Sequence, residues 1–256
     1  MNILLTNDDG YFADGLITLA KTLKNAGYNV YISAPQQEQS ATSHALILRY
    51  SFGIQNINLS ELSNGELDVP CIAVGGFPSD CVKFAISEYF KDIHFDLCIS
   101  GINTCMNVGT DCIYSGTYSA ACEASLLGVP GIALSAKMKD SKDYSYPARF
   151  LVERLEQLIK YCKKFSVLNI NMPSYKEEDI KGVVATKTGW REYNDNYVYD
   201  KETKKYHVLG KPINKANTDQ DDDCAWVDRG YISIVPIPAY FSDMGLLAKM
   251  KEDKWN

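Results

Sequence analysis

Two adjacent carboxylates, Asp8 and Asp9, are the residues whose types and spacing first suggest chemistry. They directly follow a short apolar run at residues 3–5, which is typical of a strand buried on both faces of a parallel sheet. Anions this close repel each other, and a divalent cation with oxygen ligands would relieve the repulsion. Alternatively, Asp8 caps the following helix and Asp9-Gly10 forms a turn. The stretch alone leaves both interpretations open.

Two polar segments could bring further ligands to the same place. Residues 36–44 follow a second predicted strand and include the hydroxyl side chains Ser40, Thr42 and Ser43. Residues 100–109 follow an interior strand and contain Ser100, Asn103 and Asn107. Hard cations accept the Asn carbonyl oxygen, and phosphate accepts Asn and Ser donors. Simple turn chemistry would use the same residue types.

A third segment, Ser115-Gly116-Thr117, opens a predicted helix that runs to about Leu127. Small residues at a helix start leave backbone N–H groups free, and these groups with the helix dipole favour a bound phosphate. The segment does not satisfy Gly-x-Ser-x-Gly, so it is not a hydrolase nucleophile elbow. It also lacks the Gly-Lys-Ser/Thr of a P-loop.

The elements that must position these residues alternate between strand and helix. A helical repeat of apolar residues fills residues 16–23, and residues 29–34 form the next strand, which gives a βαβ unit. Further buried strands are predicted at residues 68–74, 97–100, 131–135 and 167–172, and a possible strand at 46–54. This order predicts an α/β fold with a Rossmann-like, doubly wound, mostly parallel sheet. Such sheets bind ligands at the carboxyl ends of their strands.

The C-terminal part of the chain has a different character. The stretch from Trp190 to Val208 is extended and aromatic. We therefore expect one domain over residues 1–256, with a core at about 1–185, a β-hairpin arm at about 186–226 and a closing strand and helix at about 227–256. A hairpin that cannot bury its aromatic side chains is often an association arm, which predicts a homo-oligomer. The alternative is a hairpin folded back on its own domain.

Composition limits the possible partners and compartment. A net charge of −6 argues against a stable nucleic-acid complex or an anionic-membrane binder. The chain start lacks a basic export signal and no apolar run reaches membrane length, so we expect a cytoplasmic protein. Its eight cysteines include no Cys-x-x-Cys pair and are expected to be reduced. The three histidines, His44, His94 and His207, have no metal-ligand spacing, and we assign none a catalytic role.

Several motifs occur in an order and spacing that resemble the SurE (survival protein E) family of metal-dependent 5′/3′-nucleotidases. The resemblance runs nearly end to end, and its ordered set is far more specific than any one motif. It comprises Asn7-Asp8-Asp9-Gly10, Ala34-Pro35 with Gln39-Ser40-Ala41, Ser100-Gly101-Ile102-Asn103, Asn107-x-Gly109, Tyr114-Ser115-Gly116-Thr117, Leu168-Asn169-Ile170-Asn171 with Pro173, and Gly230-Tyr231-Ile232-Ser233 with Pro236.

The resemblance implies roles for particular residues. It implies one divalent cation per subunit, Mg²⁺ or Mn²⁺, bound by Asp8, Asp9, Ser40 and Asn103, with Asp8, Asp9 and Asn103 as the catalytic residues. It implies phosphate contacts from Asn7, Ser115, Gly116 and Thr117. It also implies a dimer or tetramer joined by a swapped C-terminal hairpin.

Three positions depart from the family pattern. Ser40-Ala41 stands where the family usually has Ser-Gly, and Thr104-Cys105 replaces the common glycine after Asn103. Asp222-Asp223 stands where the family has a Thr-Asp pair before the last strand. Ala41 could stiffen the loop that carries Ser40.

The resulting hypothesis is a metal-dependent phosphomonoesterase that hydrolyses nucleoside monophosphates, either 5′- or 3′-nucleotides. The alternative is a non-catalytic metal- and phosphate-binding regulatory module, such as a response-regulator receiver. The interior strand here ends in Ser100 and Asn103 rather than in a phosphoacceptor aspartate. A haloacid-dehalogenase phosphatase would need Asp-x-Asp, and a nicotinamide dehydrogenase would need a glycine fingerprint that is absent.

Overall fold

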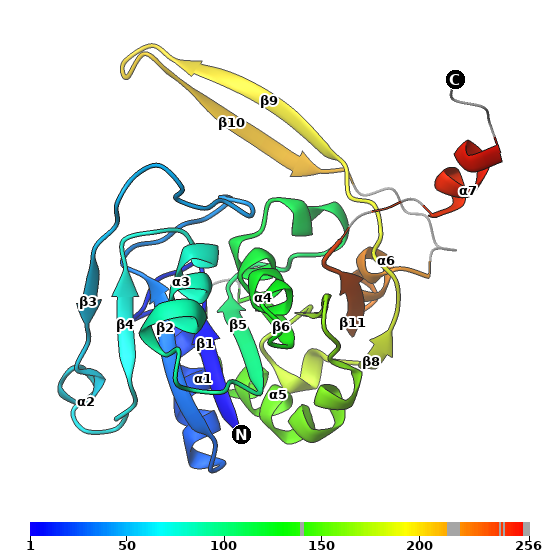
Figure 1. The fold of residues 1–256 in the computed structure, drawn as a ribbon. Coiled ribbons are helices and arrows are strands. Elements are labelled where there is room, and N and C mark those ends of the chain that lie inside the picture. Colours follow the sequence, from blue (N-terminus) through cyan, green and yellow to red (C-terminus); the bar gives the residue numbers. More distant parts are fainter. Residues whose placement is uncertain (139–140, 214–220, 241, 243, 253–256) are drawn as a thin grey trace.

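The computed structural model describes residues 1–138, 141–213, 221–240, 242 and 244–252 (Figure 1). The strands are β1 (Asn2–Thr6), β2 (Asn29–Pro35), β3 (Ile54–Asn56), β4 (Cys71–Val74), β5 (Leu97–Asn103), β6 (Gly131–Ala136), β7 (Ser166–Met172), β8 (Gly182–Ala185), β9 (Tyr193–Asp200), β10 (Lys205–Pro212) and β11 (Tyr231–Pro238). The α-helices are α1 (Asp14–Asn25), α2 (Leu59–Leu62), α3 (Pro78–Phe84), α4 (Gly116–Leu126), α5 (Ser145–Leu158), α6 (Asp223–Asp228) and α7 (Met244–Glu252). Shorter helical segments are η1 (Ala85–Tyr89), η2 (Gly109–Ile113), η3 (Ile159–Tyr161) and η4 (Glu177–Asp179).

A nine-stranded sheet forms the centre of the molecule, in the order β3-β4-β2-β1-β5-β6-β7-β11-β8. Neighbouring strands from β4 to β7 are parallel, whereas β3 and β11 run antiparallel to β4 and β7. The predicted mostly parallel α/β fold is therefore confirmed.

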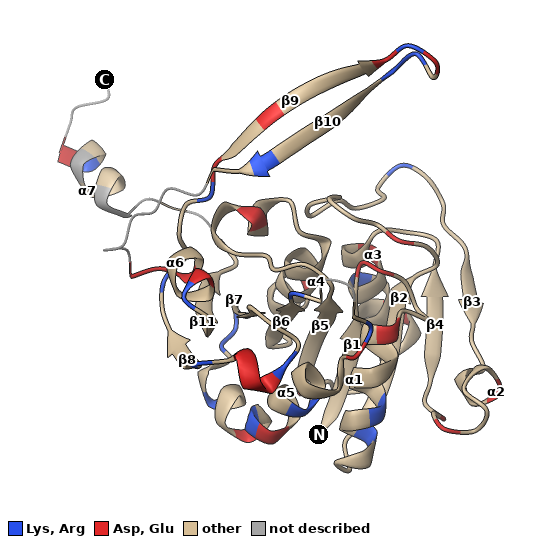
Figure 2. Cartoon of the chain, turned by 180° about the vertical axis from the view of Figure 1, so that it is seen from behind, with Lys and Arg blue, Asp and Glu red and all other residues tan. Residues whose placement is uncertain are grey.

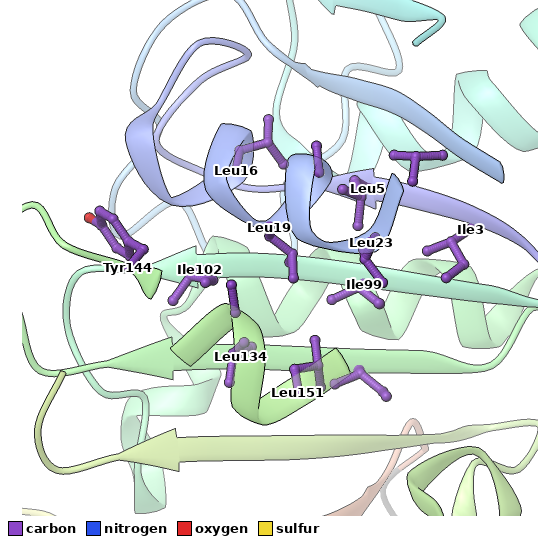
Figure 3. Close-up of a cluster of buried hydrophobic side chains, with 14 of the residues drawn as sticks. Ile3, Leu5, Leu16, Leu19, Leu23, Ile99, Ile102, Leu134, Tyr144 and Leu151 are labelled. Carbon is purple, nitrogen blue, oxygen red and sulfur yellow. The ribbon is translucent and has the colours of Figure 1, made fainter. Parts of the chain in front are cut away.

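Helices cover both faces of the sheet, which explains the apolar run of β1. Ile3 and Leu5 face α1 and α5 in the larger core cluster, shown in Figure 3. Leu4, between them, belongs to the second cluster with residues of α3 and α4. All three side chains are fully buried. Successive residues of a strand point to opposite faces, so a strand covered on both sides needs a continuous apolar sequence.

The predicted C-terminal hairpin is present as β9 and β10, which pair antiparallel outside the main sheet and project from it (Figure 1). Its C-terminal boundary differs from the expected arm of residues 186–226, because α6 begins at Asp223 and this residue is fully buried. Residues 214–220 of the expected arm, and 241, 243 and 253–256 of the closing segment, lie outside the described residues.

The possible strand at residues 46–54 is wrong except at its last residue, where β3 begins. Leu48 and Tyr50 are exposed, and the Ile47 amide donates to the Asp80 carboxylate, with 3.0 Å to Oδ1. The segment is held by this carboxylate, by the Phe52 ring packed against Phe84, and by the Gly53 carbonyl, which accepts from the Gly75 amide (2.8 Å).

Within the described part of the chain, every helix is too short or too polar to cross a membrane.

Candidate metal and phosphate site

The turn after β1 fixes the two adjacent carboxylates. Asn7 is fully buried, and its side chain closes the turn by donating from Nδ2 to the Gly10 carbonyl (2.9 Å) and accepting at Oδ1 from the Gly10 amide (3.1 Å). Gly10 has a φ of 111°, which side-chain-bearing residues rarely adopt. The Asn7 side chain is thus engaged in the turn, and its contact with phosphate stays a prediction.

Asp8 lies against the start of α4. The Thr117 hydroxyl donates a hydrogen bond of 2.6 Å to Asp8 Oδ1, and the Asp8 side chain is only 5% exposed. A Cβ on Gly116 would lie 2.9 Å from the Asp8 Cβ, so this position needs glycine. The structure therefore brings together the predicted phosphate-binding segment and a predicted metal ligand.

Ser115 is the N-cap of α4. Its hydroxyl oxygen accepts a hydrogen bond from the Tyr118 amide (3.0 Å), which is how serine commonly starts a helix. The side chain is buried beside Gly116 and Thr117. All three predicted phosphate-binding residues of this segment thus lie in the cap and first turn of one helix.

The loop at residues 36–44 approaches the same place. The Gln39 amide donates to the Asp8 carbonyl (2.7 Å), which joins this loop to the turn after β1. The Ser40 hydroxyl donates to the Glu38 carboxylate. Glu38 also acts electrostatically on both Asp8 and Asp9, so it is a third carboxylate at the site. Sequence reasoning missed Glu38, although it stands only two residues before the predicted ligand Ser40.

Asn103 is the last residue of β5, which is the parallel neighbour of β1 with Thr6 opposite Ser100. It therefore ends at the same edge of the sheet as the turn after β1. Its Nδ2 donates to the Cys105 carbonyl (2.7 Å), while no donor to its Oδ1 is found among the described residues. This arrangement leaves an amide oxygen available for a cation or a water.

The other candidates from this loop serve the fold. The Asn107 side chain donates to Ser135 Oγ (3.2 Å), and its amide and carbonyl are both held by the Asn171 side chain, at 2.7 and 3.1 Å. The Ser100 hydroxyl is buried, and within the described structure it lacks a partner.

The electrostatics of the site favour a bound cation. Burial, then the charges of Asp8 and Glu38, raises the pKa of Asp9 to about 7. Burial also raises the pKa of Asp8, although the Thr117 hydroxyl opposes that shift. No ion pair between the described residues supplies a Lys or Arg to Asp8 or Asp9. Carboxylate, amide and hydroxyl oxygens form a donor set that suits Mg²⁺ or Mn²⁺, so the residues present fit the expected metal.

A second acidic cluster, formed by Asp222, Asp223 and Cys224, has a structural explanation. Asp223 accepts hydrogen bonds from the Gly109, Gly189 and Cys224 amides at 2.7–2.9 Å. Asp222 caps α6 by accepting from the Ala225 amide (2.9 Å). Both carboxylates thus satisfy backbone donors, and Asp223 also joins the segment before α4 to the base of the hairpin.

Known proteins resemble this chain over almost its whole length. The family described as Survival protein SurE matches residues 3–195. A protein of Petrotoga mobilis named 5′-nucleotidase SurE is 35% identical over 255 residues, which cover 98% of each chain. A protein of the same name from Pseudothermotoga lettingae is 38% identical over 256 residues, covering 98% of this chain and 94% of that protein. The crystal structure of the SurE protein from Aquifex aeolicus matches with a TM-score of 0.81 and 28% identity, covering 99% of this chain and 100% of that one.

Proposed function

Because this chain belongs to the SurE family, we propose that it is a nucleotidase that hydrolyses nucleoside monophosphates to nucleoside and phosphate with a divalent cation. The observation that carries the proposal is the hydrogen bond from Thr117 to Asp8. It unites a helix start suited to phosphate with a pair of carboxylates suited to a metal. The names of the relatives favour 5′-nucleotides. A 3′-phosphate is the second substrate class to test.

The ligand atoms that each residue offers suggest which residues bind the metal and which bind the phosphate. Asp8, Asp9, Ser40 and Asn103 would hold one Mg²⁺ or Mn²⁺ per subunit. When bound, such a cation neutralises charge on the phosphoryl group and lowers the pKa of a water. The first turn of α4, from Ser115 to Thr117, binds and orients the phosphoryl oxygens through its N–H groups. Positioning of this kind supplies most of the catalysis in phosphoryl transfer.

Asp8 is our candidate for proton transfer. It is buried, and the Thr117 hydroxyl holds its carboxylate in one orientation. A fixed carboxylate next to the phosphoryl group can take a proton from the attacking water or deliver one to the leaving oxygen. Asp9 is more exposed than Asp8, which suits it to reach a ligand at the edge of the sheet.

We further propose that the hairpin joins two or more copies of the chain. Residues opposite each other in an antiparallel pair share a face, and the register places Tyr197 opposite Val208 and Tyr199 opposite Tyr206. The rings of Tyr199 and Tyr206 lie 5.0 Å apart, while Tyr197 and Tyr206 are each 69% exposed. Most of the hairpin's charged residues lie toward its tip and its base (Figure 2). An apolar face of this kind suits burial against a second copy, as a dimer or a tetramer.

The deciding experiment measures phosphate release from a panel of 5′- and 3′-nucleoside monophosphates with Mg²⁺, with Mn²⁺ and with a chelator. We expect release that needs the metal and is lost in Asp9→Asn. Folded protein that releases no phosphate with either metal would instead be a binding module.

A further inference from the structure

An ion-paired cluster is centred on Glu123 of α4, six residues after Thr117 of the proposed phosphate-binding segment. Glu123, only 3% exposed, accepts a hydrogen bond from Lys83 Nζ at Oε1 (2.7 Å). Its other oxygen, Oε2, lies 2.9 Å from Nε2 of His44. Lys83 comes from α3, whereas His44 ends the loop that carries Ser40. One buried carboxylate therefore connects α4 both to α3 and to the loop that carries Ser40.

The loop of residues 39–44 is otherwise attached to the molecule through its backbone and one hydroxyl. The Gln39 amide donates to the Asp8 carbonyl (2.7 Å). The Ser43 amide and hydroxyl donate to the carbonyls of Tyr114 (3.0 Å) and Ile113 (2.6 Å). The loop itself is tightly wound, because Ala41 and Ser43 both have positive φ angles of 55° and 57°. The His44–Glu123 contact is the charged anchor at its end.

We propose that the His44–Glu123 ion pair is a clasp that holds the loop of residues 39–44 against Asp8, so that both are positioning residues for the site. The clasp fixes Ser40, and its importance for metal binding rests on the proposed function. Because α4 also contacts Asp8 through Thr117, this one helix orients both the carboxylate and the loop that faces it.

One observation indicates that His44 does more than neutralise a buried charge. Lys83 already provides Glu123 with a cation at 2.7 Å, so the second cation is not needed for charge balance. The titratable neighbours of His44 are Glu123 and Cys122, with Tyr118 and Cys112 lining the same cavity. Hydrogen bonds to Cys122 and Glu123 raise the pKa of His44 to about 9, so the imidazole is protonated and paired at neutral pH.

The test compares His44→Gln and Glu123→Gln with the control Lys83→Met. The control removes the other cation of the same carboxylate without touching the loop. The first readout is amide hydrogen exchange of Gln39 and Ser43, whose N–H groups report directly on the attachment of the loop. We expect exchange at both amides to accelerate at least about tenfold in the two clasp variants, with amides of β1 unchanged, and to stay within about twofold in Lys83→Met.

The second readout is the dissociation constant of Mn²⁺, measured from the electron paramagnetic resonance signal of the free ion. The clasp variants should bind Mn²⁺ about tenfold more weakly, a loss of about 1.4 kcal/mol, while kcat at saturating metal stays within about twofold. Unchanged loop exchange in both variants would overturn the clasp. The exchange measurement needs no enzymatic activity, so it tests the loop attachment separately from the proposed function. If the parent protein releases no phosphate, the proposed function fails while the exchange result still decides on the clasp.

Discussion

Thr117 and Asp8 are 109 residues apart in sequence, and the hydroxyl of one donates a 2.6 Å hydrogen bond to the carboxylate of the other. The contact depends on Gly116, where a Cβ would collide with Asp8. Hydrogen bonds to an ionised acceptor are short and strong, and this one is buried. It makes the end of β1 and the start of α4 into one site.

Replacing Thr117 tests this bond. Thr117→Val keeps the shape of the side chain but removes the hydroxyl that donates to Asp8 Oδ1, which should cost about 1–3 kcal/mol in the free energy of unfolding. Phosphate release should fall by at least about tenfold, because the carboxylate is no longer oriented. Thr117→Ser, which keeps the hydroxyl, is the control. Urea unfolding and phosphate release are measured for both variants. Equal stability and equal activity of Thr117→Val and Thr117→Ser would refute the role of the bond.

Substitutions of Asp8 and Asp9 should lower activity without lowering stability. Asp8→Asn and Asp9→Asn are each expected to lower phosphate release by about 10²–10³-fold or more, since each removes a charge at the reacting centre. Both variants should nevertheless fold, and in metal-free buffer at pH 8 each should be at least as stable as the parent, because a buried repulsion is removed. Full activity in Asp8→Asn would remove Asp8 from the mechanism. A large drop in the melting temperature of either variant in metal-free buffer would contradict the proposed repulsion between Asp8 and Asp9.

Asp223 is expected to matter for stability and not for metal binding. Asp223→Ala leaves the amides of Gly109, Gly189 and Cys224 without their acceptor, which should cost about 3 kcal/mol, or roughly 6–12 °C in melting temperature. Calorimetry measures the shift, and Mn²⁺ titration below the transition should give an unchanged dissociation constant. Loss of Mn²⁺ binding by folded Asp223→Ala would instead identify the Asp222-Asp223-Cys224 cluster as the metal site.

The stabilising effect of His44 should depend on pH. Its pKa is raised from 6.5 to about 9 in the folded protein, so its contribution is fully present below about pH 6.5 and disappears as the pH rises through 9. The difference in unfolding free energy between the parent and His44→Gln should therefore shrink between pH 7 and pH 10. Comparing the two proteins at each pH cancels the titration of other groups. A constant difference would mean that His44 is not charged when paired with Glu123.

The hairpin prediction concerns assembly. Replacing Tyr197, Tyr199 and Tyr206 together by serine should weaken association at least about 100-fold, because about 150–250 Å² per aromatic side chain would no longer be buried between copies. Sedimentation velocity across a range of concentrations measures the effect. Matched substitutions at Asn196 and Lys211, on the opposite face, serve as the control. A parent protein that sediments as a monomer at all concentrations would contradict the association arm.

The sequence by itself determined the fold class and the identity of the chemical groups. The apolar run of β1, the helical repeat of α1 and the short apolar runs of the later strands report local burial, which is what hydrophobic patterning encodes. Asp8, Asp9 and Asn103 were candidates because they follow predicted parallel strands, and Ser115-Gly116-Thr117 was one because a helix start of small residues favours phosphate. Their assignment to one metal and phosphate site came from the resemblance to the SurE family.

Only the tertiary structure decided which of these groups touch and which residues support them. Periodicity cannot predict that Thr117 bonds to Asp8, that Glu38 adds a third charge, or that His44 pairs with Glu123. The possible strand at residues 46–54 also failed, since Leu48 and Tyr50 of that stretch are exposed in the structure. The physical reason is common to all four cases. Side-chain contacts between distant segments arise from how the helices pack on the sheet, and local sequence patterns carry no record of that packing.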